Sequence, residues 1–232
     1  MPTRPVLYVL AGVNGAGKCS IGGHLLTRAG LAWFNPDRFA RELIAATGMD
    51  QTAANAAAWQ EGMRRLDEAV AAGRSFAFET TLGGRSVAAR LQGAASTHDV
   101  LVWFCGLASP ELHLARVQAR VAAGGHDIPE AKIRERWNAS VANLIALLPH
   151  LAEVRLFDNS ASVAPGEAVP DPVPVAVIQR GRLAWPAPDA PAQLAATPDW
   201  AKPVLEVALT SRSLKQAVSL VLSQNSMQNE GI

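Results

Sequence analysis

The stretch from Gly12 to Lys18 has the residue types and the spacing of a phosphate-binding loop. Its sequence, G-V-N-G-A-G-K, fits the pattern G-x-x-x-x-G-K. Glycines let backbone N–H groups curve around an anion, a following helix adds positive partial charge, and the lysine reaches the outer phosphates. The residues predicted to contact a nucleotide are Gly12, Asn14, Gly15, Ala16, Gly17, Lys18, Cys19 and Ser20.

A glycine turn that matches this pattern by chance is the alternative interpretation. The flanking sequence argues against it, because an apolar run at 6–10 precedes the loop and a segment able to form a helix, 20–28, follows it. A buried strand, a glycine loop and a helix N-terminus in this order are the context that the motif requires. We therefore predict a nucleotide-phosphate site.

Cys19 departs from the pattern, which has Ser or Thr after the lysine. Mg²⁺ is a hard ion that prefers oxygen, so a thiol at this ligand position weakens metal binding, and Ser20 is one residue out of register. Three interpretations stay open. They are tolerated drift, a natural or engineered weakening of Mg²⁺ binding, and a redox-sensitive switch, because a helix N-terminus beside Lys18 favours a reactive thiolate.

Acidic residues follow several predicted strands. Phosphoryl transfer needs a phosphate cradle, Mg²⁺, a group that orients or deprotonates the acceptor hydroxyl, and cations that neutralise the transferring group. Asp37 is the candidate general base; the alternative is an acid that merely interacts well with a helix N-terminus. Glu79, with Thr80 beside it, is the candidate acceptor-binding residue or water-mediated Mg²⁺ ligand; the alternative is a solvated carboxylate.

Basic residues on both sides of a glycine-containing turn are typical of a lid that closes over phosphates. Arg116 and Arg120 are four residues apart and share a helix face. The turn lies at 124–129, and Arg134 and Arg136 begin the next predicted helix. These two flank opposite sides of that helix's core face, so we expect only one to point at the phosphates. A solvated basic surface is the alternative.

Apolar strand-like runs alternate with helical patterns through the first 160 residues. The strands are expected at 6–10, 31–34, 75–78, 100–105 and 154–157, and the helices at about 20–28, 36–48, 52–72, 85–92, 110–121 and 129–148. This alternation predicts an α/β P-loop NTPase fold with a mostly parallel central sheet, helices on both faces and an arginine-bearing helical lid. Ligands bind at the carboxyl ends of such strands, where the loop, Asp37, Glu79 and Asp158 are expected to meet.

The composition changes after residue 160. Residues 161–174 are proline-rich and predict a linker, 175–178 and 182–185 predict a hairpin on the sheet edge, and a helix is expected at about 198–222. We therefore divide the chain into a P-loop core, 1–160, and a C-terminal extension, 161–232, packed on that core.

Helical spacing also assigns apolar residues to the core. In the predicted helix 52–72, the residues that share a face and are expected in the core are Trp59, Met63, Leu66 and Val70. His126, beside Asp127, is expected to serve the turn. The other histidines show no metal-ligand spacing, and no G-x-S-x-G or C-x-x-C motif supports a hydrolase or zinc site.

The overall composition is globular and nearly neutral. Of 232 residues, 49% are hydrophobic and 18% are charged, and the net charge of +1 gives no electrostatic basis for binding nucleic acid or a membrane surface. No apolar stretch approaches the roughly 18 residues of a membrane span, and the N-terminus lacks a signal-peptide pattern. Cys19 and Cys105, in separate elements, suit a reducing compartment, so we expect a cytoplasmic protein.

Several of these pieces occur in one order and together resemble the zeta-toxin-like P-loop kinases, in particular the chromosomal branch often labelled predicted ABC-type ATPases. They are G-V-N-G-A-G-K, N-P-D at 35–37, F-E-T-T at 78–81, R-V-x-x-G-G-H-D-I-P at 120–129, I-R-E-R-W at 133–137 and L-F-D-N-S at 156–160. The resemblance spans about residues 5–160, and A-T-P-D-W-A-K-P at 196–203 extends it.

The resemblance implies a small-molecule kinase that uses ATP or GTP with Mg²⁺. In zeta toxins the acceptor is a UDP-N-acetylamino sugar, phosphorylated at the sugar 3′-hydroxyl, and a small helical antitoxin restrains the enzyme. The roles carried over are Lys18 as the phosphate lysine, Asp37 as the catalytic base, Glu79 in the acceptor-binding region, Arg120 and Arg136 as charge-stabilising arginines, Arg134 as a lesser candidate, and Asn159 near the nucleotide base.

Two other functions stay open. One is a nucleotide-binding regulatory or interaction protein with weak or no turnover, which Cys19 favours. The other is a kinase for a different small molecule, because members of this branch need not be toxins and their acceptors differ.

Overall fold

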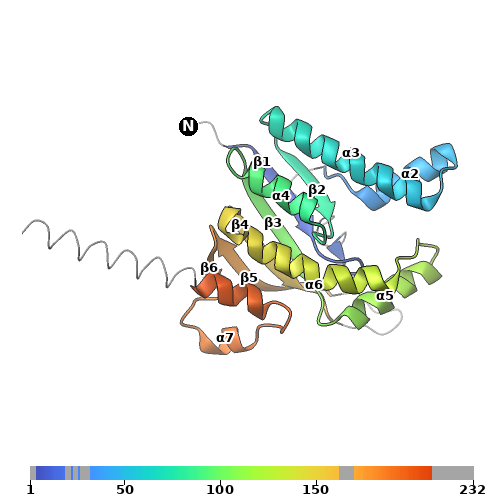
Figure 1. Cartoon of the computed structure of the whole chain (residues 1–232). Coiled ribbons are helices and arrows are strands. Elements are labelled where there is room, and N and C mark those ends of the chain that lie inside the picture. Colours follow the sequence, from blue (N-terminus) through green and yellow to red (C-terminus); the bar gives the residue numbers. More distant parts are fainter. Residues whose placement is uncertain (1–3, 19–21, 23–25, 27–31, 162–169, 211–232) are drawn as a thin grey trace, which may run out of the picture.

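The computed structural model describes residues 4–18, 22, 26, 32–161 and 170–210, so the predictions for Cys19 and Ser20 lie outside the described residues. Within that part of the chain, the centre is a six-stranded sheet with the order β2-β1-β3-β4-β5-β6 (Figure 1). The strands are β1 (Val6–Ala11), β2 (Phe76–Thr80), β3 (Asp99–Gly106), β4 (Glu153–Asp158), β5 (Val173–Gln179) and β6 (Arg182–Trp185). The first four in the order are parallel, and β5 and β6 form an antiparallel hairpin on the edge. The predicted α/β P-loop fold is confirmed.

Helices flank this sheet. They are α2 (Pro36–Thr47), α3 (Gln51–Ala71), α4 (Arg85–Ala94), α5 (Pro110–Ala122), α6 (Glu130–Leu147), the 3₁₀ helix η1 (Leu148–His150) and α7 (Pro191–Ala195). Leu7 and Val9 of β1 join the core cluster that also contains residues of α3, α4 and α6. Leu10 points to the other face, against the helical Gly22. No helix in the described ranges is both long and apolar enough to span a bilayer.

Caps place the helices that begin at the carboxyl edge of the sheet. The Asn35 side chain caps α2 and the Ser109 side chain caps α5, each followed by a proline in the first turn. Gly48 ends α2 with a φ of 72°, the left-handed conformation that glycine adopts without strain. Asp37 therefore lies in the first turn of α2, close to the end of β2.

Three elements differ from the sequence prediction. In the described part of 31–34, only Phe34 pairs, through a single parallel bridge to Phe78, because Pro36 has no N–H with which to continue a ladder. The helix α7 was not predicted. Residues 202–210 are helical, later than the predicted start at 198, and the end of that prediction lies outside the described residues.

The assignment of Trp59 to the core was wrong. Met63 and Leu66 are buried, and Val70 packs against the core, but the Trp59 side chain is 46% exposed. Helical spacing identifies the residues that share a stripe, but it does not say whether the whole stripe faces the sheet. Trp59 lies on α3 beside a cavity described below.

The C-terminal extension contributes to the main core. The Trp200 indole packs against Gly106 at the end of β3, and its ring centroid lies 5.7 Å from that of Phe104. Its Nε1–H donates to Asp158 Oδ2 at 2.7 Å. Val204 also belongs to the main core cluster. The exact division of the chain at residue 160 stays a prediction.

Candidate active site

The glycine loop follows β1 and makes very close approaches to neighbouring segments. Gly12, Gly15 and Gly17 have φ angles of 138°, 83° and 84°. A Cβ at Gly12 would lie 2.3 Å from the Cys105 carbonyl oxygen, and one at Gly17 would lie 2.2 Å from Asn159 Nδ2. These positions therefore need glycine for both backbone conformation and space.

Buried side chains from distant segments support the loop. The His113 Nδ1–H of α5 donates to the Asn14 carbonyl at 2.8 Å. The Ala16 carbonyl accepts from the Cys105 thiol and from Asn159 Nδ2, each at 2.9 Å. These contacts hold the carbonyl groups outward, which suits a loop whose N–H groups must face an anion.

The same burial decides the protonation states of two supporting groups. Burial raises the pKa of the Cys105 thiol to about 12, so it is a structural donor and not a nucleophile. Burial also lowers the pKa of His113 to about 4, which keeps the imidazole neutral at physiological pH. Neither group is placed to take part in proton transfer.

Lys18 and Glu79 form a buried ion pair at the end of the loop. Lys18 Nζ lies 3.5 Å from Glu79 Oε1 and 3.3 Å from the Val13 carbonyl oxygen. Asn35 Nδ2 donates to Glu79 Oε2 at 2.8 Å. The loop lysine and the β2 carboxylate, which the sequence assigned to separate roles, are therefore in direct contact.

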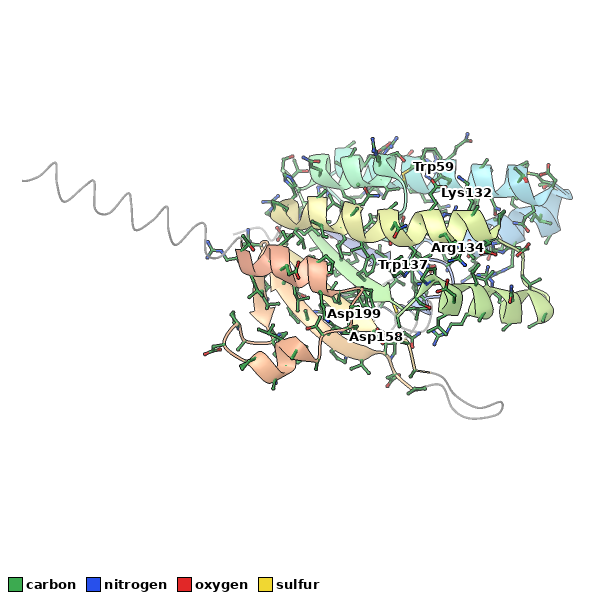
Figure 2. All side chains as sticks on the ribbon, turned by 60° about the horizontal axis from the view of Figure 1, so that its bottom comes forward. Trp59, Lys132, Arg134, Trp137, Asp158 and Asp199 are labelled. Atoms are coloured by element: carbon green, nitrogen blue, oxygen red, sulfur yellow. The ribbon has the colours of Figure 1, made fainter. Side chains whose placement is uncertain are left out.

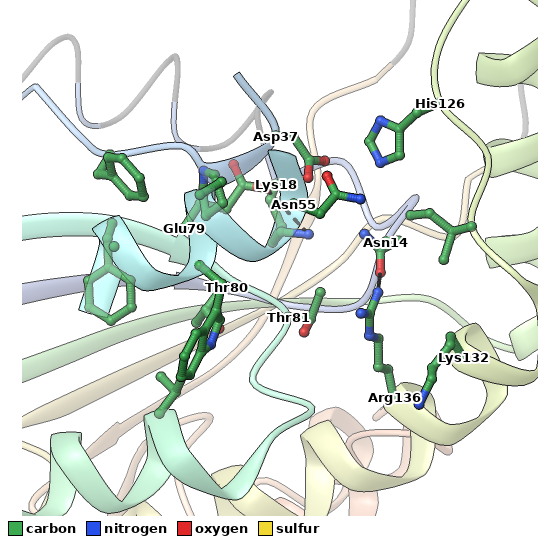
Figure 3. Close-up of a pocket in the computed structure, with 18 of the residues that line it drawn as sticks. Asn14, Lys18, Asp37, Asn55, Glu79, Thr80, Thr81, His126, Lys132 and Arg136 are labelled. Atoms are coloured by element: carbon green, nitrogen blue, oxygen red, sulfur yellow. Dashed lines mark hydrogen bonds and ion pairs between the residues drawn. The ribbon is translucent and has the colours of Figure 1, made fainter. Parts of the chain in front are cut away.

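A cavity of about 270 Å³ opens beside this pair (Figure 3). Such a volume is at the lower end of the roughly 300–1,000 Å³ of small-molecule sites. Its polar lining includes Asn14, Lys18, Asp37, Asn55, Glu79, Thr80, Thr81, His126, Asp127, Lys132 and Arg136. Its apolar lining includes Phe34, Trp59, Met63, Phe78, Val87 and Ile128.

Asp37 and His126 line this cavity, and Arg120 contacts both of them. Arg120 Nη1 lies 3.7 Å from Asp37 Oδ2, and Arg120 Nη2 donates to the His126 carbonyl at 3.2 Å. Burial is the main cause that lowers the pKa of His126. The Arg120 Nε is buried and has no hydrogen-bond partner among the described residues. Arg120 thus connects the candidate base to the turn at 124–129.

The two arginines of α6 go to different places. Arg136 lines the cavity, packs its stem against Gly83 and donates to Asn14 Oδ1 at 2.7 Å. Arg134 does not line the cavity and pairs with Glu111 of α5 and Glu130 of α6. Figure 2 labels Arg134 on α6. Of the two, Arg136 is the one that contacts the loop, and that only one of them points at the phosphates stays a prediction.

Asn159 and Arg116 lie on the other side of the loop. Arg116 Nη2 donates to the Asn159 carbonyl at 2.7 Å and to the Ala161 carbonyl at 3.0 Å. Asn159 is buried, and its side chain supports the loop, as described above. Asp158, next to it, accepts hydrogen bonds from Ser160 and Trp200, so this carboxylate does not line the cavity.

Asp37 and Glu79 are the carboxylates that could help to hold Mg²⁺ in this site. Mg²⁺ at nucleotide sites is commonly held by one or two carboxylates together with phosphate oxygens. Both carboxylates line the cavity with Lys18, so the donor chemistry fits. Among the described residues, no group of three or more His, Cys, Asp and Glu forms a metal site by itself, so substrate phosphates would have to complete the coordination.

Sequence reasoning missed Asn55, Trp59 and Lys132 as cavity residues and left His126 to the turn. One signal was available for the first two. Asn55, Trp59 and Met63 are spaced i, i+4, i+8, so they form one stripe along α3. What the sequence did not show is that this stripe faces a cavity.

The family model that matches this chain is that of an AAA domain, AAA_33, over residues 7–144. No curated protein matches the chain. Among solved structures, a chain of the AvrRxo1-ORF1:AvrRxo1-ORF2 complex with sulphate ions has a TM-score of 0.60 and 17% identity, covering 90% of this chain and 65% of that chain. The corresponding complex with ATP gives a TM-score of 0.58, 18% identity and coverage of 90% and 64%.

A further match is the PezAT chromosomal toxin-antitoxin system of Streptococcus pneumoniae, with a TM-score of 0.52, 18% identity and coverage of 67% of this chain and 68% of that chain. This chain spans about 65% of the length of the AvrRxo1 chain it matches. At these identities the matches show the fold alone. The resemblance to zeta-toxin-like P-loop kinases is therefore confirmed for the fold.

Proposed function

Because the chain belongs to the AAA_33 family of P-loop AAA domains, we propose that it is a kinase that transfers the γ-phosphoryl group of ATP or GTP to a small-molecule hydroxyl. One observation carries the proposal. The loop lysine Lys18, the carboxylate Asp37 and the cation Arg136 line a single cavity beside the glycine loop. Together these supply the phosphate contact, the base and the cation that phosphoryl transfer requires.

In this mechanism the glycine loop binds the β- and γ-phosphates through its N–H groups and Lys18. Asp37 Oδ2 accepts the proton of the acceptor hydroxyl as its oxygen attacks phosphorus. Arg120, 3.7 Å from Asp37, and Arg136 stabilise the charge on the transferring group. Mg²⁺, when bound with the nucleotide, would neutralise charge shared by the β- and γ-phosphates, and Glu79 would orient it or the acceptor.

The acceptor that we propose is the 3′-hydroxyl of a UDP-N-acetylamino sugar, on the resemblance to zeta toxins. The proposal places the kinase in the cytoplasm, where such sugars are made, and extends to a small helical antitoxin as a partner. PezAT, a toxin-antitoxin system with a similar fold, supports that last point by analogy. A kinase for another small molecule is the nearest alternative.

The test is to incubate the full chain with Mg-ATP or Mg-GTP and UDP-N-acetylglucosamine, and to detect a phosphorylated sugar by mass spectrometry. Lys18→Ala should abolish product formation, because the outer phosphates lose their cation. The matched control is Lys202→Ala, which removes an exposed lysine that pairs with Asp199 outside the cavity. No product from this sugar overturns the specific acceptor, and no product across a panel of metabolites overturns kinase activity.

Cys19 favours a second candidate function, a nucleotide-binding regulatory protein with little turnover. A thiol at the position of the usual Mg²⁺ ligand binds the metal poorly. If this function is correct, Cys19→Ser should raise turnover and reduce its Mg²⁺ requirement while nucleotide binding changes little. Unchanged Mg²⁺ dependence in Cys19→Ser would remove this candidate's support.

A further inference from the structure

Trp59 is an exposed aromatic residue that the proposed mechanism does not use. Among the described residues, three large hydrophobic side chains are exposed, namely Trp59, Val173 and Trp185, at 46%, 60% and 43%. Single exposed hydrophobic residues are common and need no explanation. Trp59 differs from the other two because it lines the cavity that holds Lys18 and Asp37.

The packing of α3 explains why this indole projects into the cavity. The small residues Ala54 and Ala58 of α3 pack against α2, and a Cβ at Gly62 would lie 2.8 Å from the Phe34 ring. This close packing occupies one face of the helix. Trp59 lies beside that face, and none of the aromatic pairs among the described residues includes it. Because the Trp59 side chain is 46% exposed and lines the cavity, part of its surface is available to a molecule there.

Groups suited to a cyclic alcohol line the same cavity. Asn55, one turn before Trp59, presents a side-chain amide, and Thr80 and Thr81 present hydroxyl groups. The Thr80 oxygen accepts from the Leu82 N–H at 3.0 Å, which leaves its own hydroxyl hydrogen able to donate. An aromatic surface with hydrogen-bonding groups around it is the usual composition of a small-molecule site.

We propose that Trp59 is a specificity-determining residue, and that its indole face is the surface on which a ring of the phosphoryl acceptor stacks. The proposal rests on the proposed function in one respect, that the acceptor occupies this cavity. It assigns the acceptor to the ring-bearing alcohols and disfavours short acyclic ones, which cannot cover the indole. Both a nucleobase and the apolar face of a pyranose have this stacking chemistry.

The test measures binding and not turnover, so that it stands apart from the test of kinase activity. The full chain is saturated with a non-hydrolysable ATP analogue, and binding is measured by calorimetry for uridine 5′-monophosphate, glucose 6-phosphate and glycerol 3-phosphate. The variants are Trp59→Ala, Trp59→Phe and the control Trp185→Ala. Trp185 has a similar exposure but lies on the β6 edge, outside the cavity.

We expect at least one ring-bearing probe to bind the wild type more tightly than glycerol 3-phosphate. Trp59→Ala should weaken that probe about tenfold or more, in the range of aromatic stacking, and remove its advantage over glycerol 3-phosphate. Trp59→Phe should keep most of the affinity, and Trp185→Ala should keep all of it. Tighter binding of uridine 5′-monophosphate would indicate that a nucleobase stacks on Trp59, and tighter binding of glucose 6-phosphate would indicate a pyranose.

Two outcomes overturn the proposal that the acceptor ring stacks on Trp59. One is equal binding of the three probes to the wild type, or no binding of any of them; the other is a ring-probe affinity that Trp59→Ala leaves unchanged. Thermal unfolding of Trp59→Ala checks that the variant is folded. Ring-probe binding that depends on Trp59, without any phosphorylated product, would support the stacking role of Trp59 and count against kinase activity alone.

Discussion

Backbone atoms and buried side chains hold the glycine loop, whereas half-exposed charges make up much of the cavity beside it. A Cβ on Gly12 would lie 2.3 Å from a carbonyl oxygen of β3, and the His113 ring that supports the loop is 1% exposed. By contrast, the side chains of Asp37, which lines the cavity, and Arg120, which pairs with it, are 37% and 36% exposed and 3.7 Å apart. The glycine loop is therefore packed within the core of the protein, whereas Asp37 and Arg120 lie where water reaches them.

This difference separates two kinds of substitution. Changes at the loop disturb atoms that have no room to move, so they act on folding as well as on binding. Changes at the wall replace groups that water already reaches, so they act on chemistry and leave stability nearly unchanged. Each of the following variants tests one side of this comparison.

Gly12→Ala should give the largest loss of stability. The φ of 138° and the 2.3 Å contact with the Cys105 carbonyl oxygen leave no unstrained position for a methyl group. We expect a loss of more than about 3 kcal/mol, which lowers the melting temperature by roughly 6–12 °C. The matched control is Gly48→Ala, where φ is 72° but nothing lies within 4 Å of the added Cβ, with an expected cost of about 1 kcal/mol. Equal melting temperatures for the two variants would contradict a loop built into the core.

Asp37→Asn should show the opposite behaviour, with a large loss of turnover in a stable protein. Removing a general base lowers turnover by about 10²–10⁴-fold. The ion pair with Arg120 is half exposed and worth about 1 kcal/mol at most, so the melting temperature should fall by no more than roughly 2–4 °C. Asp67→Asn, which removes an exposed carboxylate paired with Arg90, is the control. Turnover of Asp37→Asn within about threefold of the wild type would exclude Asp37 as the base.

His113 gives the glycine loop a pH dependence that can be tested. Burial lowers the pKa of His113 from 6.5 to about 4, so between these values the unfolded chain binds a proton that the folded chain does not. Stability should therefore fall as the pH drops from about 6.5 towards 4, by up to roughly 3 kcal/mol from this residue. His113→Gln, measured by denaturant unfolding across this range, should flatten the fall. The exposed His150→Gln should not, and an unchanged slope in His113→Gln would show that another group causes it.

The features that the sequence predicted well carry local signals. The glycine loop and the hairpin of β5 and β6 each depend on neighbours within a few residues. The alternation of elements then restricts the topology, because parallel strands need crossovers of one hand. Consequently Lys18 and Asp37 were expected on one edge, and the structure places both in the lining of one cavity.

The features that the sequence did not predict depend on contacts between distant segments. His113 supports a carbonyl 99 residues away in sequence, and no local pattern marks a histidine for that role. The exposure of Trp59 depends on which face of α3 is packed against α2 and Phe34, and not on the spacing of apolar residues within α3. Side chains that face a cavity and side chains that face a core have the same periodicity, so a sequence pattern alone does not separate them.

Arg134→Gln should have the smallest effect, although Arg134 lies two residues from a cavity residue. Its guanidinium pairs with Glu111 and Glu130 at 2.8 and 2.7 Å on the outer side of α6, and exposed pairs of this kind contribute about 1 kcal/mol or less. We expect turnover within about twofold of the wild type, whereas Arg136→Gln, which removes the contact with Asn14, should lower turnover by about 10²-fold or more. Steady-state kinetics of the two variants make the measurement. A large loss of turnover in Arg134→Gln would mean that Arg134 leaves Glu111 and contacts the phosphates during the reaction. That contact would require α6 to rotate, and it would make Arg134 a second cation of the site.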